Sequence, residues 1–263
     1  MQKKLSRRPA AKPLPASSPP FYPPFDREND ALRFPALLSP RMKSLNGIWM
    51  MDTRRAKPGE SFFTPDFEAH NWQGVPIPCS ATPDVHMLRL LREFELDSSW
   101  LKKENGTILL RFEGAGPALS VWINGVFIGC VKTKNDFAEF DITGRVQNGI
   151  NRIAVLLRRT GKDESAFLKI DQGVHLILQP RIGFQTADVR LDSRKITLGL
   201  TVRNSSERDQ MLDLSVKLLD RNNVVRPGRM IFRGLAVKAQ SGTAFSLAEP
   251  FRRFWPGLKK QSI

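Results

Sequence analysis

The sequence is poor in the residues that metal sites, disulfide frameworks and membrane spans require. Its 263 residues include two cysteines and three histidines. Cys79 and Cys130 have neither metal-ligand spacing nor the density of a disulfide framework, and no two histidines lie a helical turn or a short loop apart. No run approaches the roughly 18 apolar residues of a membrane helix. We therefore expect no metal, no membrane span and two buried free thiols.

Common catalytic and cofactor motifs are missing as well. The sequence has no Walker loop, no G-x-G-x-x-G and no G-x-S-x-G. GAGPAL at 114–119 precedes a strand pattern, so no helix N-terminus follows that could hold a phosphate, and we expect a turn there. Asp163 and Glu164 are adjacent, so on a strand they would point to opposite faces and would not share a substrate. We expect both to be solvated charges. We predict no cofactor and no catalytic residue.

Basic residues exceed acidic ones, and the net charge is +15. The excess lies mainly in the N-terminal tail and in FRRFWPGLKK, whereas the middle of the chain mixes both signs. This distribution argues against a dedicated nucleic-acid site, although binding of polyanions through the basic ends stays open as a weaker alternative. The first twenty residues carry five Lys or Arg but no apolar segment typical of a secretory signal, which favours a cytoplasmic location.

The composition of the sequence changes near residue 40. Residues 1–40 hold nine of the nineteen prolines and predict a disordered or extended lead-in. Short alternating runs follow, without a sustained helical period, so the body should be mostly β. In two of them, which we expect to be strands of one sandwich, the residues that share a face are Ile108, Leu110 and Phe112, then Leu119, Val121 and Ile123.

Turn signals complete this pattern. Asn124-Gly125 is typical of a two-residue type I′ hairpin. Beyond Pro180, alternation resumes in two further runs, with Ile196, Leu198, Leu200 and Val202 in one and Leu212, Leu214, Val216 and Leu218 in the other. We predict an all-β chain with a jelly-roll, galactose-binding-like sandwich over residues 41–180 and a smaller immunoglobulin-like sandwich over residues 181–263.

Five blocks in one order resemble a known family. They are SPRMKSLNGIWMM, NWQGVPIP, LLREFELDSSW, TILLRFEGAGPALSVWINGVFIG and AEFDITGRVQNGINRIAVLLRR. Together they resemble the N-terminal sugar-binding domain of glycoside hydrolase family 2, which includes β-galactosidases, β-glucuronidases and β-mannosidases. The β unit that ends in FRRFWPGL resembles the immunoglobulin-like domain that follows it in the family.

The resemblance implies which domain of such enzymes carries out hydrolysis. In the family, hydrolysis belongs to a TIM barrel of about 250 residues that carries two catalytic Glu residues. No Glu here follows Asn, as the family's acid/base usually does. We therefore expect a non-catalytic portion of a family 2 enzyme, truncated or split from its barrel. The alternative is a stand-alone carbohydrate-binding or subunit-assembly module, which would pair with a barrel subunit or form a homo-oligomer.

Sugar contacts are expected at three residues. Arg158 matches an Arg of the family's sugar-contacting segment, but Gly161 stands at the position of its Asp, and Asp163 lies two residues further on. Trp122 of the W-I-N-G block is the third, because an aromatic face can stack on a pyranose. For Trp49, Trp72, Trp100, Trp122 and Trp255, packing in a core or against another domain is the more frequent role of so large a ring.

Overall fold

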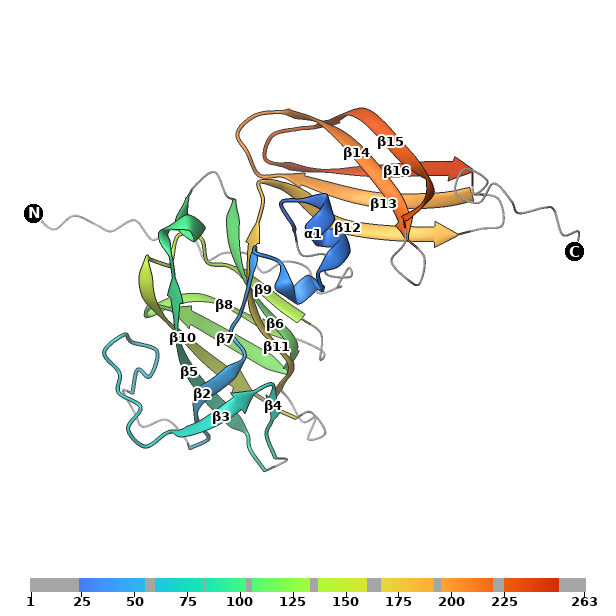
Figure 1. Cartoon of the computed structure of the whole chain (residues 1–263). Coiled ribbons are helices and arrows are strands. Elements are labelled where there is room, and N and C mark those ends of the chain that lie inside the picture. The colour runs from blue at the N-terminus through green and yellow to red at the C-terminus, as the bar shows by residue number, and fades with distance from the viewer. Residues whose placement is uncertain are drawn as a thin grey trace, which may run out of the picture. The chain divides into compact units, whose positions relative to one another are not determined.

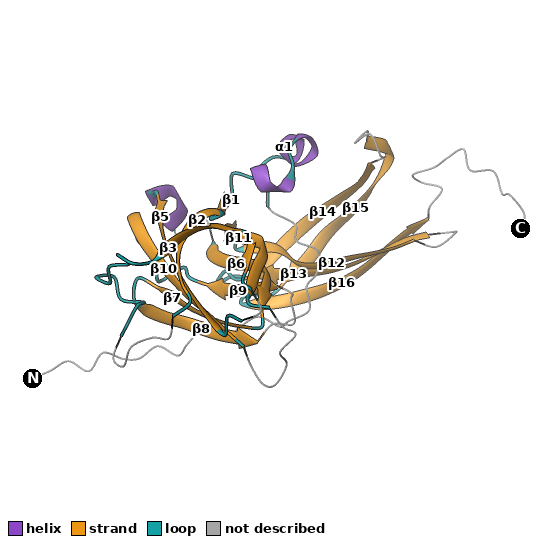
Figure 2. Cartoon of the chain, turned by 90° about the horizontal axis from the view of Figure 1, so that it is seen from below, coloured by secondary structure: helices purple, strands orange, loops and turns teal. Residues whose placement is uncertain are grey.

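The computed structural model describes residues 24–54, 60–82, 84–102, 106–132, 137–159, 167–191, 195–219 and 225–250 (Figure 1). Most of them lie in strands (Figure 2), which confirms the all-β prediction. The described helices are short: α1 (Glu28–Arg33), η1 (Ala36–Leu38) and η2 (Ser98–Leu101). None of these described helices has the length and apolar character needed to cross a membrane.

The chain divides into two compact units on either side of the Gln179-Pro180 bond. Unit 1 contains Pro40–Gln179, and unit 2 contains Pro180–Ile263 together with the described residues 24–39. Of the lead-in expected over residues 1–40, residues 1–23 lie outside the described part of the chain. Residues 24–39 contain α1 and η1, and the Glu28 carboxylate of α1 forms an ion pair with Lys217 of unit 2.

Unit 1 is built from two antiparallel sheets. The five-stranded sheet has the order β1 (Met42–Ser44), β11 (Lys169–Gln179), β6 (Thr107–Gly116) and β9 (Phe137–Asp141), and β4 (Cys79–Ser80) also pairs with β11. The six-stranded sheet has the order β3 (Gln73–Ile77), β2 (Gly47–Asp52), β5 (Met87–Leu96), β10 (Gly149–Arg158), β7 (Ala118–Ile123) and β8 (Val126–Lys132).

The core of unit 1 is made by the facing sides of these sheets. The predicted faces of β6 and β7 are buried, and the two strands belong to opposite sheets, so their apolar rows meet. Trp49 of β2 is fully buried in the same core and donates its indole N–H to the Leu45 carbonyl at 2.8 Å. Burial of apolar surface contributes about 25 cal/mol per Å², so this continuous core is the main stabilising feature of the unit.

The Asn-Gly hairpin is confirmed. Ile123 and Val126 pair directly, which leaves Asn124 and Gly125 as a two-residue turn. Both turn residues have positive φ, 49° and 81°, as a type I′ turn requires.

Unit 2 contains two smaller antiparallel sheets among its described residues. One has the order β12 (Ile182–Leu191), β13 (Lys195–Asn204) and β16 (Ser241–Pro250), and the other pairs β14 (Gln210–Leu219) with β15 (Val225–Val237). The predicted face of β13, Ile196, Leu198, Leu200 and Val202, is buried. On β14, Leu212 and Leu214 are half-buried opposite Leu235 and Phe232, whereas the side chain of Leu218 lies outside the described residues.

Candidate functional site

Trp122 lies on the outer face of the six-stranded sheet, as the alternation of β7 predicts. Its neighbours Val121 and Ile123 are fully buried in the core, and Trp122 itself is half-buried. One face of its ring stacks on Phe63, with ring centroids 5.1 Å apart and planes 8° from parallel. Phe127 of β8 lies beside it at 5.3 Å. The ring face that could stack on a sugar is thus in contact with another aromatic ring.

The segment that supplies Phe63 connects β2 to β3, and its residues 60–72 are here called the covering loop. Its aromatic side chains form a second apolar cluster with Leu91 and Ala154 on the outer face of the sheet. Phe62 and Trp72 are its most buried aromatic members, with ring centroids 5.9 Å apart. This face is therefore a packed interior of its own and not an open platform.

A buried arginine of the sheet, Arg89, contacts Glu60 and Trp72 of the covering loop. Arg89 of β5 is 2% exposed and forms ion pairs with Asp52 and, at 2.6 Å, with Glu60. Its guanidinium also lies 5.2 Å from the ring centroid of Trp72. Burial would raise the pKa of the Asp52 carboxyl, but hydrogen bonds from Arg54 and the charges of Arg89 and Arg54 outweigh it and lower that pKa.

A second arginine holds the loop from the side. Arg152 of β10 donates from one guanidinium nitrogen to three loop carbonyls, those of Thr64, Pro65 and Phe67, at 3.3, 2.8 and 2.6 Å. Its other terminal nitrogen forms an ion pair with Glu93 at 3.1 Å. Three carbonyls at one guanidinium fix the course of the loop, because each would otherwise require water or another donor.

The hairpin turn also meets the covering loop. A Cβ on Gly125 would lie 2.9 Å from Cδ of Pro65, so the turn requires glycine for space as well as for its positive φ. The side chain of Asn124 accepts from the Arg152 N–H at 2.8 Å and donates to the Arg145 carbonyl and to Asn151. Asn124-Gly125 thus has a structural role that joins β7, β10 and the loop.

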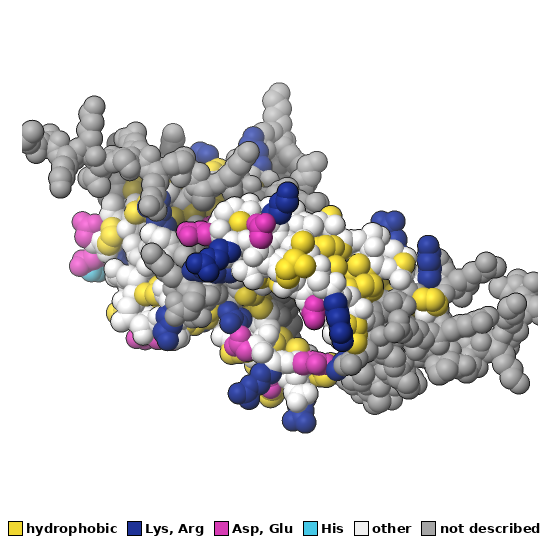
Figure 3. Space-filling view, turned by 90° about the horizontal axis from the view of Figure 1, so that it is seen from above, with side chains coloured by type: hydrophobic (Ala, Val, Ile, Leu, Met, Phe, Trp, Pro, Cys, Tyr) yellow, Lys and Arg dark blue, Asp and Glu magenta, His cyan; other side chains and the backbone are white. Residues whose placement is uncertain are grey.

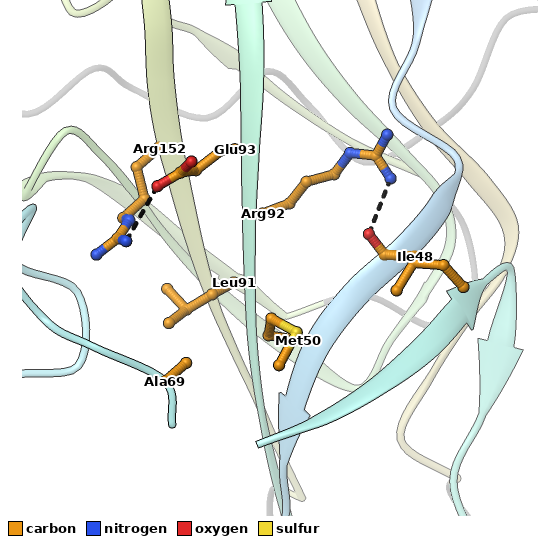
Figure 4. A pocket seen from close by; sticks show the side chains of 7 residues that line it. All are labelled: Ile48, Met50, Ala69, Leu91, Arg92, Glu93 and Arg152. Carbon is orange, nitrogen blue, oxygen red and sulfur yellow. Dashed lines mark hydrogen bonds and ion pairs between the residues drawn. The ribbon is translucent and has the colours of Figure 1, made fainter. Parts of the chain in front are cut away.

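Beside the covering loop, β2 and β5 separate and leave a pocket, here called the wedge pocket. Their pairing includes Met50–Asp52 only, whereas β2 begins at Gly47 and β5 extends to Leu96. The pocket measures about 310 Å³, and its lining residues, drawn in Figure 4, are Ile48, Met50, Ala69, Leu91, Arg92, Glu93 and Arg152. Its volume lies at the lower end of the range of ligand pockets, about 300–1,000 Å³.

The five-stranded sheet carries a polar row on its own outer face. Ser44, His175, Arg111 and Glu139 lie opposite one another across β1, β11, β6 and β9. Arg111 forms ion pairs with Glu113 and Glu139, both at 2.8 Å. Burial lowers the pKa of the His175 imidazole, and nearby Arg111 adds to this, whereas Glu113 opposes it. The row is an ion-pair network around a histidine that favours its neutral form and whose Nδ1 is buried without a hydrogen-bond partner among the described residues.

Of the three residues expected to contact sugar, the two in the described part of the chain, Trp122 and Arg158, are not brought together. Trp122 packs under the covering loop, and Arg158 is exposed at the end of β10, opposite Ala118 rather than Trp122. Asp163 lies outside the described residues, so its position stays a prediction. The sequence analysis missed the covering loop, Arg92, Glu93 and Arg152. One signal was available: Arg92 interrupts the alternation Leu88, Leu90, Phe94 and Leu96 on the core side of β5.

The cysteines and histidines behave as isolated residues. Both cysteines are free, but Cys130 is exposed and Cys79 half-buried, so the expectation of two buried thiols is wrong. Cys130 pairs with Ser120 on the outer side of edge strand β8, which has no neighbouring strand to cover it. His70 and His86 are exposed and His175 is buried. Within the described ranges, no three His, Cys, Asp or Glu side chains gather in a group that could hold a metal.

The described charges show no continuous basic patch on the face in Figure 3. Lys and Arg side chains lie among Asp and Glu side chains there, and hydrophobic side chains lie between them. This agrees with the mixed signs of the middle of the sequence. The basic segments at the two ends, 1–23 and 251–263, lie outside the described residues.

Two antiparallel sheets enclosing one core, joined to a smaller two-sheet unit, define a β-sandwich protein with an appended β domain. Residues 73–176 match the model described as "Glycosyl hydrolases family 2, sugar binding domain". Residues 73–176 are thus similar to the sugar-binding domain of glycosyl hydrolase family 2, which confirms the resemblance drawn from the sequence.

Curated relatives point to the same family. A β-galactosidase of Priestia megaterium is 25% identical over 76% of this chain and 23% of the enzyme. A β-galactosidase of Yersinia pestis is 29% identical over 46% of this chain and 14% of the enzyme. The chain thus spans less than a quarter of the length of these enzymes.

Solved structures support the fold. A β-glucuronidase of Bacteroides uniformis matches with a TM-score of 0.66 and 18% identity, over 80% of this chain and 27% of that one. A β-glucuronidase of an uncultured Clostridium species matches with a TM-score of 0.57 and 17% identity, over 81% and 43%. At these identities the likeness concerns the arrangement of strands.

Proposed function

We propose that the chain is the non-catalytic, carbohydrate-binding N-terminal portion of a β-galactosidase-like family 2 glycosidase. Hydrolysis would then belong to a TIM barrel that these residues do not supply. The observation that carries the proposal is the match of residues 73–176 to the family's sugar-binding domain, a span that includes nine of the strands of unit 1 from β3 to β11. The relatives that share these residues are named as β-galactosidases.

Two measurements on the purified chain test this proposal. With aryl β-galactoside, β-glucuronide and β-mannoside we expect no hydrolysis above the rate without protein, because retaining hydrolysis requires two carboxyl groups about 5–5.5 Å apart in one cleft. By calorimetry we expect heat on addition of galactosides or β-glycans at millimolar concentration. Hydrolysis that disappears in a Glu113→Gln/Glu139→Gln variant would place catalysis within this chain and contradict the proposal. Absence of heat with every sugar would remove its carbohydrate-binding part.

A subunit-assembly role is the second candidate, and the edge strand β8 favours it. β8 lies at the end of the six-stranded sheet, where Val126 and Phe127 are 41% and 45% exposed. An exposed apolar edge strand is a surface on which another chain can add a strand. Light scattering after size exclusion tests this role: we expect a dimer or larger assembly that Phe127→Lys disperses. A monomer at all concentrations would exclude a homo-oligomer.

A further inference from the structure

The wedge pocket exposes backbone hydrogen-bonding groups inside a sheet. Backbone groups of alternate residues point to the same edge of a strand. The Arg152 carbonyl accepts from the Asn124 N–H, and the Arg152 N–H donates to the Asn124 side chain, so both backbone groups of Arg152 point to the β7 side. The backbone groups of Ile153 therefore point to β5, and those of its partner Arg92 point back to β10. The groups of Glu93 therefore point toward β2, where no pairing continues past Leu91.

Side chains occupy the two ends of this separation. The Ile48 carbonyl of β2 accepts a hydrogen bond from Arg92 at 3.2 Å. The Glu95 carbonyl of β5 accepts from the Lys43 ammonium at 2.7 Å. Between these two ends, Glu93 lines the pocket, and its side chain is drawn in Figure 4. The wedge thus offers both acceptors and donors to a molecule that enters it.

Arg92 is the lining residue with a charge that no acid balances. Its guanidinium is half-buried, lies 6.0 Å from the Trp49 ring centroid and donates to one carbonyl, and its Nε is buried without a hydrogen-bond partner. Among the described residues no carboxylate oxygen lies within 4 Å of it, in contrast to Arg152, which is paired with Glu93. Burial accordingly lowers the pKa of Arg92. Buried charges in proteins are normally paired, so this guanidinium suits an anionic ligand group.

The rest of the pocket suits a ring with one apolar side. Met50 and Leu91 form an apolar floor and Ala69 one wall, while Glu93 and Arg152 lie above them (Figure 4). A pyranose has C–H groups on one face and hydroxyls at its rim, and this combination matches an apolar floor below polar side chains. A volume of about 310 Å³ has room for one such ring.

We propose that the wedge pocket binds an acidic monosaccharide unit, a uronate, with its carboxylate on Arg92, its hydroxyls on Glu93 and its C–H face on Met50 and Leu91. The choice of a carboxylate depends on Arg92 alone. The choice of a sugar rather than another hydroxy acid rests on the proposed carbohydrate-binding function. Trp122 does not line this pocket, although Ala69, Met50 and Leu91 belong to the same cluster on the outer face of the sheet.

Calorimetry on the full chain tests the site with sodium D-glucuronate and sodium D-galacturonate, against D-galactose and sodium acetate at matched ionic strength. We expect binding of at least one uronate and at least tenfold weaker binding of galactose and acetate at this pocket. Arg92→Gln should weaken uronate binding by about tenfold or more, because it removes a charge-assisted hydrogen bond. Arg203→Gln makes the same change at an exposed residue of unit 2 and should leave uronate binding unchanged.

A second variant covers the case in which Arg92→Gln does not fold. Ile48 is 63% exposed at the rim of the pocket, so Ile48→Trp can fill the entrance without disturbing the core. We expect Ile48→Trp to abolish uronate binding while the far-ultraviolet spectrum and the unfolding midpoint stay as in the wild type.

Three results would overturn the proposal: no heat from either uronate at tens of millimolar, equal binding of galactose and uronate, or uronate binding that both Arg92→Gln and Ile48→Trp leave intact. These outcomes are separate from those of the proposed function. Galactoside binding that persists in Ile48→Trp, without uronate binding, would retain the carbohydrate-binding function and remove the wedge site. Hydrolysis by the chain would remove the non-catalytic function and leave the wedge site unaffected.

Discussion

The two faces of the six-stranded sheet are covered in different ways. The inner face packs against the opposite sheet, and its side chains, such as Trp49 and Val121, are fully buried. Among the described residues, the outer face is covered by the loop of residues 60–72, which is held there by aromatic packing and by hydrogen bonds from Arg152. The same strands therefore support an opposing sheet on one face and, on the other, a loop held by aromatic packing and hydrogen bonds.

The largest effect should come from the inner face. Trp49→Ala removes a fully buried ring together with its hydrogen bond to the Leu45 carbonyl. We expect a loss of about 3–5 kcal/mol in the free energy of unfolding, because the surrounding core cannot collapse into the space. Denaturant unfolding followed by tryptophan fluorescence and circular dichroism measures it. A loss below about 1 kcal/mol would show that the core is less tightly packed than described.

A smaller effect should follow from releasing the outer cover. Arg152→Gln removes the donor shared by three loop carbonyls, and we expect a loss of about 1.5–3 kcal/mol, the range for hydrogen bonds to charged groups. Limited proteolysis should then cut within residues 60–72 at least several times faster than in the wild type.

Arg158→Gln is the matched control for this variant, because Arg158 is an exposed arginine on the same strand. Its cleavage rate within residues 60–72 should equal that of the wild type. Equal rates in Arg152→Gln and the wild type would mean that the aromatic cluster alone holds the loop.

The smallest effect that we predict is a change in the pH dependence of stability. The pKa of Asp52 in the folded chain lies below its ordinary value of 3.8. The ionised carboxyl therefore stabilises the fold above pH 3.8, and this contribution is lost as the pH falls through the folded-state pKa. We expect Asp52→Asn to reduce the slope of stability against pH in this acidic range. Asp66→Asn, an exposed change in the covering loop, is the control variant.

Alternation in the sequence was sufficient to predict the strands and the inner face. Ile108 to Phe112 and Leu119 to Ile123 are buried as predicted, because a packed face requires a period of two wherever the other face is polar. The Asn-Gly hairpin was also predictable, since few residues tolerate two successive positive φ angles.

The outer face could not be predicted in the same way. Phe63 and Trp122 are 59 positions apart, and nothing in a local pattern indicates that a loop folds back over its own sheet. The wedge pocket depends on where β2 and β5 cease to pair, which is a property of two strands together. Arg92 interrupts the alternation in the sequence, but its place in the lining of a pocket follows only from the separation of β2 and β5.

Asn124 has a further consequence for the accuracy of folding. A slip of β7 by one residue against β10 would exchange Trp122 with Val121, directing the indole into the core and the small side chain to the loop. Such a slip would break the contacts of Asn124 with Arg152, Arg145 and Asn151 at once. The Asn124 side chain thus favours the observed register of β7, in which Trp122 points to the outer face of the sheet.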